Sequence, residues 1–187
     1  TDSLVGSEMC IRDRIEDLIS YRLKNEKLVK LKKTDKIVIK NKKYQIKIFE
    51  NQLDGSEHFA LIKGKISPSK NTRVRVISSN LVESYLLGKR LPNSFNNTLD
   101  YFKDYNNCIL VFIRDSNLKS VSSTLRDFKS DKKNIIGTDK LIRNYGIGAQ
   151  IIKALRVKNM ILVTRSPKKV IGLEGFGIRI TKQEIIK

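Results

Sequence analysis

The sequence predicts an α/β protein, a mixed β-sheet with helices packed on it and a strand-rich N-terminal half. Residues 37–48 alternate apolar and other side chains, which is the two-residue period of half-buried strands. Residues 108–115 and 159–164 each hold a continuous apolar run, typical of a buried central strand. Between these runs, residues 139–155 have the apolar spacing of a helix. An α+β arrangement fits the same alternation.

The first half of the chain reads as one helix followed by strands. Residues 15–30 carry apolar side chains on roughly one helical face. The alternating stretch at 37–48 predicts a β-hairpin, with Asn41-Lys42 at its turn. Residues 57–66 and 72–79 alternate as well, so each predicts another strand.

The second half adds helices between the strands. We expect a helix over residues 94–105 with Ser94 as its N-terminal cap. The polar residues 122–134 indicate a short helix and a loop. Gly146 and Gly148 lie inside the helix at 139–155 and indicate close packing there.

The last buried strand leads into a further helix. Ser166-Pro167 is a typical helix start, because proline suits the first helical position after a serine cap. Lys168 and Lys169 then lie in the first turn, where the helix dipole repels cations. A solvated surface turn explains them, but so does a bound phosphate on the free N–H groups. Gly175 and Gly177 end this helix, and a final strand follows.

The composition limits the possible partners and metals. Lys and Arg total 38 against 19 Asp and Glu, which gives a formal net charge of +19. This excess favours anionic partners, although an A/T-rich genome also enriches lysine, isoleucine and asparagine. Cys10, Cys108 and His58 are the whole Cys/His set, so no ordinary Cys/His metal site is available. Two cysteines form no disulfide framework, which points to a reducing, cytoplasmic chain, and no apolar run reaches the ~18 residues of a membrane span.

Residues 141–180, "LIRNYGIGAQIIKALRVKNMILVTRSPKKVIGLEGFGIRI", closely resemble the C-terminal part of GTP cyclohydrolase II. That family reads Arg-(Asp/Glu)-Tyr-Gly-Ile-Gly-Ala-Gln-Ile-Leu, then Leu-Thr-Asn-Asn-Pro-x-Lys, then Gly-Leu-x-Gly-Tyr-Gly. Residues 54–64, "DGSEHFALIKG", resemble the family's Gly-x-Glu-His-x-Ala-Leu strand. The resemblance covers roughly residues 15–185.

The resemblance implies a domain plan and a set of partners. Residues 15–35 resemble the connector that follows a 3,4-dihydroxy-2-butanone 4-phosphate synthase domain in bifunctional riboflavin-pathway proteins, so residues 36–187 are the expected cyclohydrolase-like domain. Residues 1–14 resemble translated adapter sequence, and we expect a non-native leader there. The family further implies GTP or another phosphate ligand, an upstream synthase partner and a homodimer, whereas nucleic acid and membrane are not expected partners.

GTP cyclohydrolase II uses a zinc held by three cysteines, and residues 77–94 align with that motif. The family reads His-Ser-Glu-Cys-Leu-Thr-Gly-Asp, then Arg-Cys-Asp-Cys-Gly. Ile77 stands at the histidine and Ser79 at the glutamate, and Asn80, Leu91 and Pro92-Asn93 replace the cysteines and the aspartate between two of them. Leucine cannot bind zinc and asparagine binds it poorly, so we expect no metal and no zinc-bound hydroxide. The matching positions that remain are Ser78, Leu81 and Arg90.

Two further motifs are altered or mixed. The family's Leu-Arg-Gln-Glu-Gly-Arg-Gly-Ile-Gly-Leu corresponds to residues 113–123, where Arg114 remains and Ser116-Asn117-Leu118 replaces Glu-Gly-Arg. Arg143 matches the arginine proposed as the family's nucleophile, but Leu141 occupies the position of its general base. Thr164 and Lys169 match nucleotide-contacting residues of the family. Together with Lys168, Arg75 and Arg90 they are the candidate phosphate-binding residues.

The resemblance and the substitutions lead to three hypotheses. The first is a catalytically degenerate GTP cyclohydrolase II-like domain that supports or regulates a synthase domain. The second is an active cyclohydrolase, producing formate and pyrophosphate from GTP, with rewired ligands. The third is a basic nucleic-acid-binding module, for which we expect steeply salt-dependent binding. We expect His58 to be a satisfied surface or core residue and not a catalyst, and Cys108 to be a small hydrophobic residue at the start of a buried strand.

Overall fold

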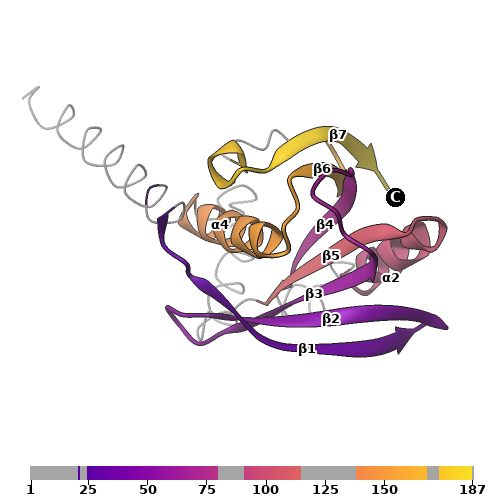
Figure 1. Cartoon of the computed structure of the whole chain (residues 1–187), viewed down its shortest axis with the longest axis horizontal. Coiled ribbons are helices and arrows are strands. Elements are labelled where there is room, and N and C mark those ends of the chain that lie inside the picture. Colours follow the sequence, from indigo (N-terminus) through magenta and orange to yellow (C-terminus); the bar gives the residue numbers. More distant parts are fainter. Residues whose placement is uncertain (1–20, 22–24, 80–90, 115–137, 168–172, 187) are drawn as a thin grey trace, which may run out of the picture.

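The computed structural model describes residues 21, 25–79, 91–114, 138–167 and 173–186, with the backbone alone at 79, 91–93, 138–145 and 174. These residues form a seven-stranded mixed sheet in the order β1-β2-β3-β5-β4-β6-β7 (Figure 1). The strands are β1 (Val29–Ile39), β2 (Lys42–Asn51), β3 (Glu57–Gly64), β4 (Thr72–Ser79), β5 (Asn107–Arg114), β6 (Asn159–Thr164) and β7 (Arg179–Ile185). The helices are α2 (Leu91–Tyr101) and α4 (Thr138–Ala154), with 3-10 turns η2 (Phe102–Asp104) and η3 (Leu173–Phe176).

The sheet changes from antiparallel to parallel at β5. Strands β1, β2, β3 and β5 pair antiparallel in that order, and β5, β4, β6 and β7 pair in parallel. The predicted α/β mixed sheet with a strand-rich first half is therefore confirmed. Pairing of β3 with β5 also places the hairpin half and the parallel half in one continuous sheet.

The predicted hairpin is present, with its turn one residue earlier than expected. Ile39 pairs with Lys42, and the two turn residues Lys40 and Asn41 both have positive φ, at 48° and 59°. Two positive φ values suit the right-handed twist of hairpin strands, and asparagine tolerates them well. Residue 25 is helical, but residues 26–28 are not and strand β1 begins at Val29, so the helical interpretation of 15–30 is wrong for residues 26–30. The expected boundary between residues 35 and 36 falls inside β1.

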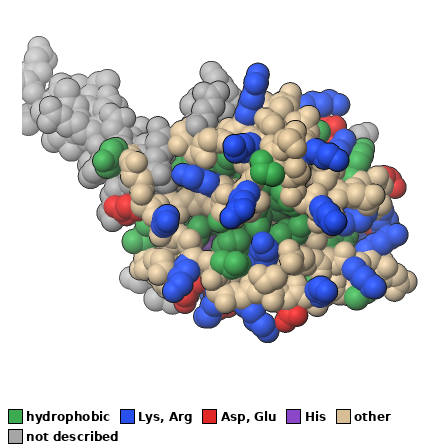
Figure 2. All heavy atoms as spheres, in the orientation of Figure 1, with side chains coloured by type: hydrophobic (Ala, Val, Ile, Leu, Met, Phe, Trp, Pro, Cys, Tyr) green, Lys and Arg blue, Asp and Glu red, His purple; other side chains and the backbone are tan. Residues whose placement is uncertain are grey.

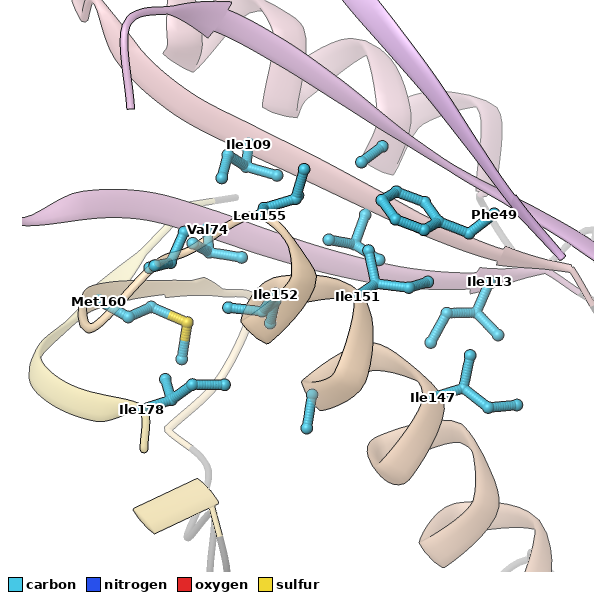
Figure 3. Close-up of a cluster of buried hydrophobic side chains, with 14 of the residues drawn as sticks. Phe49, Val74, Ile109, Ile113, Ile147, Ile151, Ile152, Leu155, Met160 and Ile178 are labelled. Carbon is cyan, nitrogen blue, oxygen red and sulfur yellow. The ribbon is translucent and has the colours of Figure 1, made fainter. Parts of the chain in front are cut away.

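One face of the sheet is covered by α4. Ile147, Ile151 and Ile152 point from α4 onto β-strand side chains that include Phe49 and Ile113 (Figure 3). These five side chains are 4% exposed or less, as the helical spacing of the sequence predicts. The helix therefore gains most of its stability from burying this apolar face.

Gly148 explains how closely α4 approaches the sheet. A Cβ at this position would lie 3.3 Å from Ile113 Cδ1 and 3.6 Å from Val76 Cγ1. Since the first distance is tighter than ordinary van der Waals contact, the predicted close packing of this glycine is confirmed.

The opposite face is covered by α2, whose start differs from the prediction. Alternate residues of β4 and β5 point to this side, where Ile77, Leu99 and Phe102 form a second buried cluster. The helix begins at Leu91, not at Ser94, because the first turn of a helix tolerates Pro92. Ser94 thus lies inside the helix and is not its cap, which frees its hydroxyl for a contact described below.

The predicted strands over 108–115 and 159–164 are confirmed as β5 and β6, and the helix at 139–155 is confirmed as α4. The expected helix start at Pro167 and the polar stretch 122–134 lie at or outside the limits of the described residues. In the described part of the chain, no helix is long and apolar enough to cross a membrane.

Candidate anion-binding site

The parallel half of the sheet presents one shared edge where β4, β5, β6 and β7 end. Ligands of α/β proteins bind at this carboxyl edge. Here β6 ends at Thr164 and leads into the segment with the two lysines, while the first turns of α2 lie against the neighbouring β4 side.

Arg75 is the clearest polar feature near this edge. It projects from β4 toward α2 and is only 5% exposed. Its Nη1 donates to the Val163 carbonyl oxygen at 3.2 Å, and its Nη2 donates to Ser94 Oγ at 3.2 Å. Its Nε is buried and has no hydrogen-bond partner among the described residues. The guanidinium therefore connects β4, the end of β6 and α2, while its buried Nε–H group donates to no described residue.

The charge of Arg75 is not balanced by any described carboxylate within ion-pair distance. Burial, and next the positive charge of Arg165, lower the pKa of Arg75 below its usual value. An arginine stays protonated in proteins, so the lowered pKa measures how unfavourable this buried cation is. A bound anion would remove that cost, supply an acceptor for Nε, and balance Arg165 as well.

Thr164 stands at the end of β6 and is 5% exposed. Its hydroxyl donates to the Ser166 carbonyl oxygen at 2.8 Å, and its own carbonyl accepts from the Ile186 amide at 2.9 Å. The side chain thus fixes the turn that leaves the strand. Lys168 and Lys169 follow this turn and lie outside the described residues.

Arg143 is placed by its backbone alone, in the first part of α4. Gly148 contacts Ile113 and Val76 near the ends of β5 and β4, and a helix between two parallel strands runs antiparallel to them. Position 143 lies five residues earlier, about 7–8 Å farther along the helix axis and toward the carboxyl edge. Arg90 and the segment that replaces the family's Glu-Gly-Arg lie outside the described residues.

Two residues of this site were missed by the sequence analysis. Ser94 was assigned to a helix cap, but its hydroxyl accepts a hydrogen bond from Arg75. Arg165 follows Thr164 directly and adds a second positive charge near Arg75. The signal for Arg165 was its position just after a buried strand. Nothing in the sequence indicated Ser94, because its partner is 19 positions away in another element.

The residues at the family's zinc motif do not fit a zinc ion. Ile77 is 4% exposed and packs in the apolar cluster under α2. The only described cysteine, Cys108, is fully buried in β5, and burial raises the pKa of its thiol to about 11. A cysteine binds zinc as its thiolate, so this buried thiol is unsuited to the role. No group of three or more metal-binding side chains occurs within the described ranges.

His58 is a satisfied core residue, as expected. It is 1% exposed, its Nδ1 accepts from the Arg114 amide at 3.2 Å, and its Nε2 lies 3.3 Å from Ser56 Oγ. Ser56 Oγ in turn donates to Asp54 at 2.6 Å. Burial is the largest cause that lowers the pKa of His58, which favours the neutral ring at neutral pH.

Comparison with known proteins shows the family to which this chain belongs. Residues 31–184 match a family model described as GTP cyclohydrolase II. The probable monofunctional riboflavin biosynthesis protein RIBA 3, chloroplastic, of Oryza sativa subsp. japonica is 32% identical over 178 residues, covering 89% of this chain and 33% of the rice protein. The riboflavin biosynthesis protein RibBA of Chlorobium phaeovibrioides is 28% identical over 180 residues, covering 90% of this chain and 44% of that protein.

A solved structure has the same fold. It is the crystal structure of RibBX, a two domain 3,4-dihydroxy-2-butanone 4-phosphate synthase from A. baumannii, with a TM-score of 0.63 and 24% identity. The match covers 90% of this chain and 44% of that protein. The chain therefore spans less than half the length of each of these relatives.

Proposed function

Because this chain belongs to the GTP cyclohydrolase II family of riboflavin biosynthesis, we propose that it is a catalytically silent member of that family. In this proposal it is a structural or regulatory domain of a larger protein whose other domain is a 3,4-dihydroxy-2-butanone 4-phosphate synthase. The homodimer expected from the resemblance belongs to the same proposal.

The observation that carries the proposal is the residue set at the zinc motif. Ile77 is buried in the apolar cluster where the family's histidine would stand, and Asn80, Leu91 and Asn93 offer no thiolate. Ring opening of GTP in this family requires a zinc-activated water, so these substitutions remove the chemical step. Leu141 at the position of the family's general base, and Ser116-Asn117-Leu118 in place of its Glu-Gly-Arg, also favour the loss of catalysis.

The synthase partner is supported by the printed descriptions of similar proteins. RibBX is described as a two domain synthase, and its fold matches this chain over less than half of its own length. The rice relative is described as monofunctional, so one activity per protein occurs among relatives of this chain. A silent cyclohydrolase-like domain beside an active synthase accounts for both descriptions.

We include a phosphate ligand in the proposal. Arg75 is buried with an unpartnered Nε, Arg165 adds charge, and β6 ends beside them at Thr164. Lys168 and Lys169 follow within five residues of that strand end. Such a set suits the phosphate groups of GTP or of a related metabolite.

A calorimetric titration of GTP, with and without added zinc and followed by a formate assay, tests the proposal. We expect GTP binding without formate under both conditions. Zinc-dependent formate release would instead establish an active cyclohydrolase with rewired ligands. Absence of any GTP binding would contradict the retained phosphate site and leave a purely structural domain.

A further inference from the structure

The antiparallel half of the sheet carries an open hollow that the proposed function does not use. Its volume is ≈ 820 Å³, and it lies where the β1–β2 hairpin extends past the end of α4. Its apolar lining includes Val38 of β1, Ile62 of β3, Ile66 and Leu155. Val38 lies next to the hairpin turn on the edge strand β1 and is 64% exposed, and Ile66 is partly exposed, whereas Ile62 and Leu155 are buried. Val38 and Ile66 are therefore the apolar side chains of the hollow that the described chain leaves at least partly uncovered.

Every charged side chain that lines this hollow is a lysine. They are Lys36, Lys43, Lys47 and Lys65. Cross-strand register puts Val38 opposite Lys43, so an exposed apolar side chain and a cation are neighbours on one face. Figure 2 shows the same mixture, with blue Lys and Arg side chains around green apolar ones.

These four lysines differ from three lysines of the β1–β2 hairpin that form ion pairs. Lys32 pairs with Glu50 and Glu57, Lys33 with Asp35, and Lys40 with Asp100. None of the four lining lysines takes part in an ion pair with the described residues. The four lysines around the hollow thus have no carboxylate partner among the described residues, as is also true of Lys30 and Lys42 on the same hairpin.

The chemistry of the surface selects among occupants. A symmetric contact between two copies at this surface is disfavoured, because it would bring the lining lysines of both copies together. Single-stranded nucleic acid binds by stacking its bases on aromatic side chains. The one aromatic residue in the lining, Tyr44, is only 4% exposed and offers no stacking surface. A protein segment with acidic side chains beside apolar ones matches both the lysines and Val38.

We propose that this hollow is a docking surface for a partner protein segment that carries acidic side chains on either side of apolar ones. The apolar side chains of the segment cover Val38 and Ile66, and its carboxylates pair with Lys43 and Lys47. The inference goes beyond the proposed function, because it uses neither the carboxyl edge of the sheet nor a nucleotide.

Fluorescence anisotropy tests the inference with a short fluorescein-labelled peptide in which pairs of Glu alternate with single Leu. We expect saturable binding by the full chain. The double variant Lys43→Glu, Lys47→Glu should weaken binding at least tenfold, and Val38→Ser should weaken it about threefold. All three residues are on the surface of the hollow, so circular dichroism should show an unchanged fold.

Matched controls separate docking from general charge attraction. The double variant Lys70→Glu, Arg179→Glu makes the same change in net charge at exposed positions outside the hollow, and it should change binding less than twofold. A peptide with Ser in place of Leu should bind at least tenfold more weakly. Equal binding of the Ser peptide, equal loss in both double variants, or tighter binding of single-stranded DNA that Lys43→Glu, Lys47→Glu abolishes would overturn the proposal.

Discussion

Gln150 Oε1 accepts a hydrogen bond from the Leu28 amide at 2.8 Å, across 122 positions of sequence. The same side chain donates from Nε2 to the Glu26 carbonyl oxygen at 3.0 Å. Gln150 is 7% exposed and Leu28 is equally buried, so solvent does not replace these bonds easily. One helix side chain therefore fixes the backbone of the segment that leads into β1, and with it the direction from which the chain enters the domain.

Replacing Gln150 with alanine should destabilise the protein by about 1–3 kcal/mol, because the buried Leu28 amide loses its acceptor. Urea denaturation followed by circular dichroism measures this loss. Gln52→Ala is the matched control, since Gln52 is exposed and contacts Leu28 through its backbone amide only. Equal stability of the two variants would show that Gln150 does not anchor this segment.

Gly64 should tolerate no side chain. Its φ is +79°, and a Cβ would lie 1.6 Å from the Asn106 carbonyl oxygen. Gly64→Ala should therefore cost more than about 3 kcal/mol or prevent folding, because a backbone atom cannot rotate away. Gly55 has a similar φ of +67° with no atom within 4 Å, so Gly55→Ala isolates the conformational cost of about 1–2 kcal/mol. Similar losses for both variants in urea denaturation would contradict the contact.

Arg75 should couple stability to anions. We expect inorganic pyrophosphate to raise the melting temperature of the wild-type chain. A ligand at about 100 times its Kd adds roughly 2.7 kcal/mol to the free energy of unfolding. Arg75→Met should abolish that shift while changing the ligand-free stability little, since it removes a buried cation with no described carboxylate partner. Differential scanning fluorimetry measures both effects.

Arg73 is the control for Arg75, because it lies on the same strand face but is already paired. It donates to Glu184 at 3.1 Å and stacks over Tyr105 at 3.6 Å from the ring centre. Arg73→Met should lower the ligand-free melting temperature and keep the pyrophosphate shift. A loss of the pyrophosphate shift in Arg73→Met, or its persistence in Arg75→Met, would place the anion elsewhere.

His58 should make stability depend on pH below neutrality. Its pKa is lower in the folded state than the usual 6.5, mainly because of burial. As the pH falls, the unfolded chain therefore binds the proton at a higher pH than the folded chain does. The stabilising contribution of neutral His58 is complete above about pH 6.5 and decreases as the pH drops below it. We expect the unfolding free energy to decrease with a slope of at most about 1.4 kcal/mol per pH unit from this residue.

His58→Gln is the matched variant for the pH dependence. A glutamine amide can accept from the Arg114 amide and donate to Ser56 Oγ, but it does not titrate. The variant should have a flatter stability profile between pH 7 and the lower range where carboxylates titrate. An unchanged slope would assign the pH dependence to groups other than His58.

The strands, α4, the hairpin and the family can be predicted from the sequence, because each depends on local periodicity or on contiguous motifs. Residues 108–115 and 159–164 are apolar enough to be central strands in any arrangement, and Gly148 marked a close contact. The pairing of β3 with β5, the place of Ser94 inside α2 and the Gln150–Leu28 hydrogen bond could not be predicted from the sequence and are seen in the folded chain. The folded chain also shows that Arg75 is a buried cation whose Nε–H group donates to no described residue. Each of these depends on atoms brought together from distant parts of the chain, and no local pattern records which distant partner a buried polar group will meet.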